Sequence, residues 1–196
     1  ALGKNNINIS AIAQGASEKN ISAVIDKIEA KKALYTLHER FFEERIKELN
    51  LFVTGVGNVG EKFLAQINQQ KKYIKENLKL KIRVIGVSNS RQMFFDENGI
   101  DLSNWKELLK NGEKAGIDTY FSRVSKLNLR NSIFIDITAN QNVSEMYEPY
   151  LRQNIAVVTC NKIACASSSE NYNTLKNVSR KSNVSFLYET NVGAGL

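Results

Sequence analysis

The sequence has 196 residues, of which 42% are hydrophobic and 24% are charged, with two cysteines and a net charge of +7. These values are typical of one α/β domain with a small appendage, and they exclude a disulfide-rich framework. No apolar run approaches the ~20 residues of a membrane-spanning helix, so we predict no membrane association. The positive charge lacks a nucleic-acid recognition motif, so we predict no nucleic-acid partner. The absence of an export signal predicts a reducing, cytoplasmic location.

Residues 1–46 predict a small α+β segment. Two β-branched runs, at 6–14 and 21–27, flank the turn-forming sequence "GASEKN", which favours an antiparallel strand pair. After these runs, apolar residues recur at helical intervals in "EAKKALYTLHERFFEE". We therefore expect a helix there, with an apolar stripe that covers the strand pair.

Residues 47–196 repeat a strand–helix–strand pattern that predicts a doubly wound parallel sheet. The expected strands span 50–54, 82–87, 132–137, 155–159 and 184–189, and the expected helices lie near 58–77, 104–111, 142–153 and 170–181. Because the sequence begins at Ala1 and stops in "NVGAGL", we expect it to be a segment of a longer polypeptide.

Three glycines at G-x-G-x-x-G spacing follow the first of these strands, in "LFVTGVGNVGEKF". Between a strand and a helix, this spacing is typical of a dinucleotide-binding turn. Gly55 would permit the sharp turn, Gly57 would let a pyrophosphate approach, and Gly60 would let the helix pack closely. The first N–H groups of the helix, near Asn58 and Val59, would face the phosphates. A glycine-rich turn without a ligand is the alternative.

The second strand ends in "VIGVSNSRQ", without the acidic residue that holds the ribose hydroxyls in NAD-preferring sites. Ser88, Asn89, Ser90 and Arg91 stand in that stretch, and the first acid after it is Asp96. A guanidinium can pair with the additional phosphate of NADP. We therefore predict that NADP is preferred or accepted, with an exposed loop arginine as the alternative.

Two later strands are expected to end at the same sheet edge. "DITAN" places Thr138 and Ala139 there, and "VVTCNKIACASS" places Asn161 and Lys162 there. A lysine at this position can reach a substrate oxygen or the nicotinamide ribose as a fixed charge or donor. A surface lysine near a helix start fits the position equally well.

Several motifs together resemble a known family. "VTGVGNVG", "GVSNSR", "DLSNW", "VVTCNKIA" and "FLYETNVGAGL", in this order and spacing, resemble the homoserine dehydrogenase half of bifunctional aspartokinase/homoserine dehydrogenases. "GKNNINISAIAQGASEKNISAVID" with "LHERFF" resembles the end of the ACT-type regulatory region. The resemblance implies a Rossmann-type doubly wound sheet preceded by a partial ACT-like segment. It also implies NAD(P)-dependent interconversion of aspartate 4-semialdehyde and homoserine, in threonine and methionine biosynthesis.

The resemblance implies roles for individual residues and partners. Lys162 matches the lysine of the family's T-P-N-K motif, which contacts the cofactor near the substrate, and Thr138 matches a residue of the cofactor cleft. Gln14 matches a glutamine implicated in threonine binding, and the family suggests a homo-oligomer. The cofactor loop and the segment beside the adenosine ribose match Gly55, Gly57, Asn58, Val59, Gly60, Ser88, Asn89 and Arg91. A monovalent-cation site, usually for sodium, matches Glu189 and the backbone carbonyls of Val192, Ala194 and Leu196.

The sequence departs from the family in three respects, one of which is that we expect the regulatory region to be cut, without its opening strand and helix. Cys160 replaces the proline of T-P-N-K, which relaxes the backbone before Asn161. The family's catalytic domain follows "NVGAGL", so we expect this chain to bind cofactor without turning over substrate alone. Two alternatives remain open, a non-catalytic sensor with amino-acid-binding and nucleotide-binding modules, and another Rossmann enzyme acting on a semialdehyde or hydroxy acid. "TCNK" with "YETNVGAGL" favours the dehydrogenase, because a sensor does not need that pair.

Overall fold

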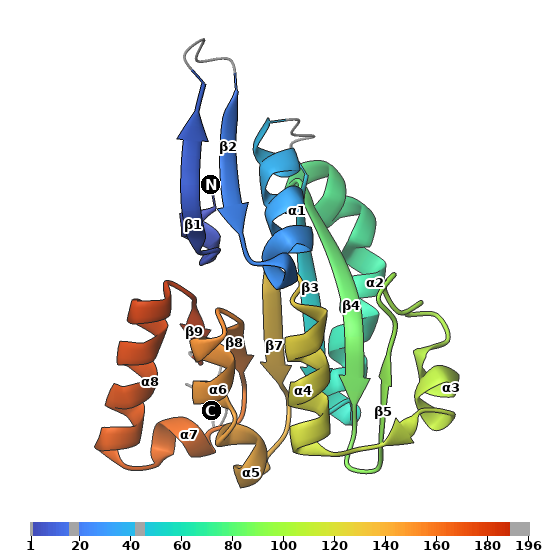
Figure 1. The fold of residues 1–196 in the computed structure, drawn as a ribbon. Coiled ribbons are helices and arrows are strands. Elements are labelled where there is room, and N and C mark those ends of the chain that lie inside the picture. The colour runs from blue at the N-terminus through green and yellow to red at the C-terminus, as the bar shows by residue number, and fades with distance from the viewer. Residues whose placement is uncertain (1, 16–19, 42–45, 189–196) are drawn as a thin grey trace. The chain divides into compact units, whose positions relative to one another are not determined.

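A computed structural model describes residues 2–15, 20–41 and 46–188, which belong to two compact units, 1–45 and 46–196. The elements of the first unit are η1 (Gly3–Asn5), β1 (Ile9–Gln14), β2 (Ile21–Ile25), η2 (Lys27–Glu29) and α1 (Ala30–Phe41) (Figure 1). Strands β1 and β2 pair antiparallel, as the sequence predicts. Leu2, Ile7 and Ala33 form the small core of this unit.

The second unit is built on a seven-stranded sheet of order β6-β5-β4-β3-β7-β8-β9. Its strands are β3 (Lys47–Thr54), β4 (Leu80–Ser88), β5 (Gln92–Phe95), β6 (Glu113–Lys114), β7 (Ser132–Asp136), β8 (Ala156–Thr159) and β9 (Phe186–Leu187). Strands β4, β3, β7, β8 and β9 are parallel. The predicted doubly wound fold is therefore confirmed, although the antiparallel edge formed by β5 and β6 was not predicted.

The helices of this unit are α2 (Asn58–Asn77), α3 (Trp105–Lys110), α4 (Ile117–Leu127), α5 (Gln141–Ser144), α6 (Tyr147–Arg152), α7 (Ile163–Ala166) and α8 (Ser169–Ser182). The single helix expected over 142–153 is wrong, because the chain forms α5 and α6 there. A proline ring clashes with the carbonyl four residues earlier in a continuous helix, and Pro149 instead lies in the first turn of α6. Within the described residues, no helix has both the length and the apolar character needed to cross a bilayer.

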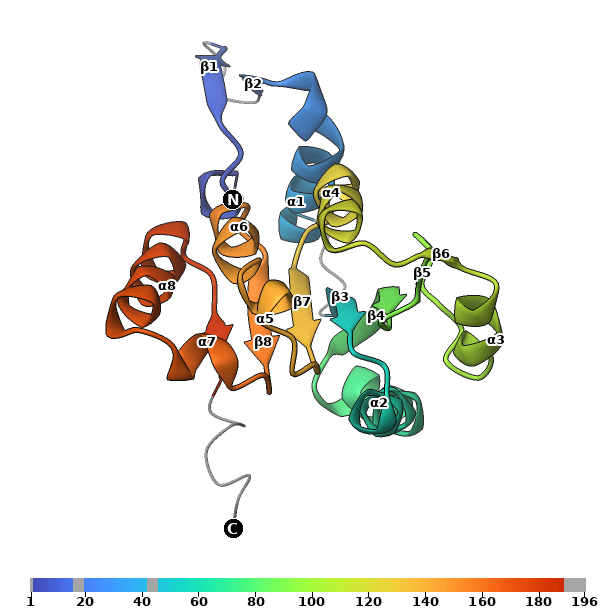
Figure 2. The same ribbon diagram turned by 90° about the horizontal axis from the view of Figure 1, so that it is seen from below.

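The helices cover both faces of the sheet, as Figure 2 shows with α2 on one side and α4 and α6 on the other. On the first face, Leu64 and Ile67 of α2 pack in a core with Val53 of β3. On the opposite face, Phe52 and Phe134 pack with side chains of α4, α6 and α8. The connections change face between β3 and β7. Ligands of open α/β sheets bind at such a point, beyond the carboxyl ends of the strands.

A charged cluster joins the beginnings of β3 and β4. Glu48 accepts hydrogen bonds from Lys81 Nζ at 2.6 Å and from Arg83 Nη1 at 3.1 Å. Partial burial raises the pKa of the Glu48 carboxyl, but the hydrogen bonds and charges of Lys81 and Arg83 outweigh it and lower the pKa overall. The ionised carboxylate therefore contributes to stability at neutral pH.

Glu48→Gln is expected to lower the free energy of unfolding at neutral pH by less than about 1 kcal/mol, because the ion pairs are partly exposed. The difference from wild type should disappear as the pH falls through the lowered pKa, since the wild-type carboxylate is then protonated as well. Urea unfolding at neutral pH and at about pH 3 measures this difference. Glu76→Gln, on the exposed face of α2, is the control. An equal loss at both pH values would contradict the assignment.

Candidate functional site

Four neighbouring strands end at the same level of the sheet. Thr54 of β3 pairs with Ser88 of β4 and with Asp136 of β7, and Asp136 pairs with Thr159 of β8. The turn after β3 is attached to its neighbour, because the N–H of Gly55 donates to the carbonyl of Ser88 at 2.8 Å. The segments that the sequence marked separately therefore meet at one edge.

The three glycines meet different surroundings. Gly55 has φ +97°, and a Cβ there would lie 2.5 Å from the carbonyl oxygen of Ile137 and 2.8 Å from Cγ2 of Thr138. A Cβ on Gly60 would meet the carbonyl oxygen of Gly55, so α2 packs directly on the turn. A Cβ on Gly57 would meet no described atom within 4 Å. Gly55 and Gly60 are thus required by protein packing, whereas Gly57 borders open space that a ligand can occupy.

The beginning of α2 is suited to an anionic group. No side chain caps this 20-residue helix, and its first N–H groups, those of Asn58, Val59 and Gly60, lack intrahelical acceptors. Glu61 in the first turn accepts a hydrogen bond from Lys106 Nζ at 2.6 Å. Lys106 lowers the pKa of Glu61 and offsets its negative charge. The positive end of the helix dipole therefore remains available to a phosphate.

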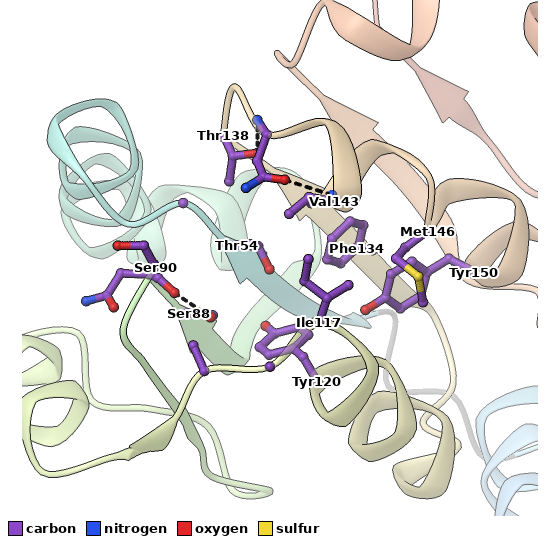
Figure 3. A pocket seen from close by; sticks show the side chains of 15 residues that line it. Thr54, Ser88, Ser90, Ile117, Tyr120, Phe134, Thr138, Val143, Met146 and Tyr150 are labelled. Carbon is purple, nitrogen blue, oxygen red and sulfur yellow. Dashed lines mark hydrogen bonds between the residues drawn. The ribbon is translucent and has the colours of Figure 1, made fainter.

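A pocket of about 450 Å³ lies at this edge (Figure 3). Its polar lining comes from strand ends and following loops, and includes Thr54, Ser88, Ser90, Thr138 and Asn140. Its apolar lining comes from α4, from β7, and from α6 with the residue before it. It includes Ile117, Tyr120, Phe134, Met146 and Tyr150. Aromatic and aliphatic surfaces beside hydroxyl and amide groups suit a planar ring joined to a sugar.

The turn between β4 and β5 is shaped by Asn89. Its Oδ1 accepts the N–H of Arg91 at 2.7 Å and the N–H of Gln92 at 2.8 Å. Arg91 is exposed on this turn. The N–H of Asp96 donates to the carbonyl of Ile85, so β5 carries this acid back along β4 and away from the edge. No acidic residue lies among residues 88–95, where a ribose-binding carboxylate would stand.

The loops after β7 and β8 are in contact through Asn161. Its Nδ2 donates to the carbonyl of Asn140 at 3.0 Å, and its Oδ1 accepts the N–H of Ile163 at 3.1 Å. Lys162 lies between these bonded positions and is exposed at the start of α7. The N–H of Cys160, which a proline would lack, donates to the carbonyl of Asp136 at 3.1 Å. A strand-like hydrogen bond therefore constrains the backbone at the position where the family motif has proline.

Sequence reasoning missed part of the pocket. Helix α4 was not predicted, although Ile117, Tyr120 and Val124 follow an i, i+3, i+7 pattern that signals an amphipathic helix. The prediction from "DITAN" gives Asp136 no role. No pattern of neighbouring residues indicates it, because its side-chain partners include residues from two later segments.

The remaining predicted positions are not part of the pocket lining described above. Gln14 is exposed at the end of β1, and Ala139 is exposed beside Thr138. The predicted cation ligands lie outside the described residues, and they are Glu189, Val192, Ala194 and Leu196. Among the residues that the structure does describe, no three His, Cys, Asp or Glu side chains are grouped to hold a metal ion.

Comparison with known proteins places both parts of the chain. Residues 55–189 match the model of the homoserine dehydrogenase NAD-binding domain, and residues 1–41 match that of the ACT domain. Over 198 aligned residues the chain is 40% identical to chloroplastic bifunctional aspartokinase/homoserine dehydrogenase 1 of Arabidopsis thaliana and 39% identical to the bifunctional enzyme of Haemophilus influenzae. It is covered completely in both alignments but spans only 22% and 24% of those relatives.

A solved structure supports the same fold. A hyperthermophilic archaeal homoserine dehydrogenase in complex with NADPH aligns with a TM-score of 0.60 and 23% identity, over 73% of this chain and 44% of that one. At this identity the likeness concerns the fold. The family model, in contrast, matches more than half of the sequence. The chain therefore belongs to the homoserine dehydrogenase family, of which it contains the NAD-binding domain.

Proposed function

We propose that the chain is the cofactor-binding part of a bifunctional aspartokinase/homoserine dehydrogenase that interconverts aspartate 4-semialdehyde and homoserine. The observation that carries the proposal is the open space beside Gly57 at the uncapped start of α2, on the turn whose Thr54 and Gly55 also line the pocket. The chain spans less than a quarter of the two bifunctional relatives compared above. We therefore propose that it binds NADP or NAD without completing the reaction alone.

Different residues at the sheet edge are proposed to bind different parts of the cofactor. The N–H groups of Asn58, Val59 and Gly60 bind the pyrophosphate, and the pocket between α4 and α6 takes the adenosine. Lys162, exposed beside the 138–140 loop, directs a positive charge toward the nicotinamide ribose or a substrate oxygen. When bound, the nicotinamide cofactor supplies the hydride chemistry, and the protein orients it.

Gly57→Ala tests the cofactor site directly. The added methyl meets no described protein atom within 4 Å, so the fold should persist, but the methyl occupies the space through which the pyrophosphate approaches. We expect NADPH affinity to fall by about tenfold or more, equivalent to about 1.4 kcal/mol. Calorimetric titration with NADPH measures the affinity, and thermal unfolding verifies the fold. Ala65→Gly, on an exposed position of α2, is the control. Unchanged NADPH affinity in folded Gly57→Ala would contradict the proposal.

NADP is the proposed cofactor, because residues 88–95 contain no acid and Arg91 is exposed at the strand end. Arg91→Ala should weaken NADPH binding by about tenfold through loss of a charge-assisted contact to the additional phosphate, and should leave NADH binding nearly unchanged. The two affinities are measured by titration of the same preparation. Arg180→Ala, exposed on α8, controls for net charge. An unchanged ratio of NADPH to NADH affinity would rule out this role of Arg91.

Threonine is the proposed effector of the ACT segment, and Gln14 is the residue proposed to contact it. Gln14 is exposed at the end of β1, where it pairs with Ile21. Gln14→Ala should abolish measurable threonine binding, because the amide supplies both a donor and an acceptor. Calorimetry with threonine compares the full-length protein as wild type, as Gln14→Ala and as the control Ser22→Ala. Wild-type threonine affinity in Gln14→Ala would refute the assignment.

Three further parts complete the proposal, of which the cation and the oligomeric state come from the family resemblance. The cation is sodium, held by Glu189 and the carbonyls of Val192, Ala194 and Leu196, which are outside the described residues. The protein is a homo-oligomer, which the exposed apolar side chains of the strand pair support; these are Ile12, Ile21 and Val24. The compartment is a reducing one such as the cytoplasm, consistent with Cys160 and Cys165 forming no disulfide in the described part of the chain.

A further inference from the structure

A closed hydrogen-bonded ring lies beneath the sheet edge, formed by three side chains together with the side-chain amide and the backbone N–H of a fourth residue. Asp136 and Tyr147 are 0% exposed, and Thr159 and Asn161 are 1% exposed. Tyr147 Oη lies 2.6 Å from Asp136 Oδ2 and 2.7 Å from Thr159 Oγ1. Asn161 closes the ring, because its N–H donates to Thr159 Oγ1 at 2.8 Å and its Nδ2 donates to Asp136 Oδ2 at 3.0 Å.

The direction of each hydrogen bond in this ring is determined. The Asp136 carboxylate accepts the single hydroxyl hydrogen of Tyr147, so the contact with Thr159 is donated by Thr159. Thr159 in turn accepts from the N–H of Asn161. Burial, followed by the charge of Asp136, raises the pKa of Tyr147 far above its ordinary value, so its proton stays in place. Reversal of one bond would leave two donors or two acceptors facing each other.

The ring is attached to both loops of the site. Asp136 Oδ1 accepts the N–H of Thr138 at 2.7 Å, which fixes the start of the loop after β7. Asn161 reaches the same loop through the carbonyl of Asn140 and holds the N–H of Ile163, directly after Lys162. Movement of either loop would therefore break bonds of a buried carboxylate, which is costly in a low-dielectric interior.

We propose that Asp136 and Tyr147 are positioning residues for cofactor binding, acting through the ring on the 138–140 loop and on Lys162. This inference rests on the proposed function, because it assumes that these two loops contact the cofactor. Both residues are fully buried, so neither touches the cofactor itself. The ring instead restricts the loops to one geometry before the cofactor arrives, which reduces the ordering cost of binding.

Tyr147→Phe tests the ring while keeping the aromatic packing against Phe134 and Phe186. The change removes a donor from Asp136 and an acceptor from Thr159. We expect NADPH affinity to fall by about tenfold. Thr159→Val breaks the same ring at a smaller side chain and should have a similar effect. The double variant should bind no more weakly than the worse single variant, because both changes interrupt one cooperative unit.

A matched control distinguishes a positioning role from a contribution to stability alone. Val178→Ala opens a cavity in the same core at a residue of α8 that is not part of the ring, and it should lower the melting temperature without changing NADPH affinity. If Tyr147→Phe and Thr159→Val lower the melting temperature as Val178→Ala does, yet bind NADPH like wild type, the positioning role is overturned. Should Tyr147→Phe fail to fold, Thr159→Val alone decides.

A cofactor-independent measurement distinguishes this inference from the proposed function. Cys160 lies between the ring residues Thr159 and Asn161; the residue is exposed, and its Sγ donates to the carbonyl of Asp136 at 3.7 Å. In a Cys165→Ala background, the rate of Cys160 alkylation by iodoacetamide should rise several-fold in Tyr147→Phe, because the loop is released. If wild type fails to bind NADPH, the proposed function is wrong. The alkylation rates still test whether the ring holds the loop. Equal rates in the two proteins would overturn the inference.

Discussion

The close approach between the turn after β3 and the end of β7 is the constraint on which the site depends. Gly55 lies against Ile137 and Thr138 with no room for a Cβ, and its positive φ turns the chain directly into α2. Gly60 repeats the constraint one helical turn later, because it packs on the carbonyl of Gly55. A bulkier turn would displace the helix start from the strand ends. The glycines therefore bring the positive end of α2 to the edge where four strands finish.

The change of helix face between β3 and β7 provides the rest of the pocket. Because α2 covers one face and α4 and α6 cover the other, the strand ends are left open between them. Side chains from α4 and α6, such as Tyr120 and Tyr150, then approach Phe134 from two sides and form an apolar floor. The same aromatic residues therefore pack the core and line the pocket. This sharing limits how far the core can vary without changing the pocket.

The buried carboxylate of Asp136 costs stability but holds three segments of the chain in one arrangement. A desolvated carboxylate costs free energy, and an apolar residue of similar volume would remove that cost. The cost is offset by three donors, which are the hydroxyl of Tyr147, the amide of Asn161 and the N–H of Thr138. Each donor belongs to a different segment. Because the three donors share one acceptor, these segments have one arrangement. Apolar packing is less directional and would define that arrangement less sharply.

The sequence by itself determined the features that depend on neighbouring residues. Strand and helix periodicity predicted the doubly wound sheet, and the helix expected near 58–77 is α2, Asn58–Asn77. Glycine spacing located the turn, and the strand ends around Thr138 and Lys162 were recognised as parts of one edge. These signals are local, since backbone conformation and side-chain period follow from adjacent residues.

Only the tertiary structure decided the features that join distant residues. The antiparallel edge of β5 and β6 depends on pairing across the sheet, and the pocket floor depends on helices approaching from both sides of Phe134. Asp136 meets Asn161, 25 residues later, because parallel register aligns the ends of β7 and β8, and it meets Tyr147, 11 residues later, because α6 packs against β8. No local pattern encodes these meetings. They arise when the sheet fixes the register, and with it the ring that holds the two loops.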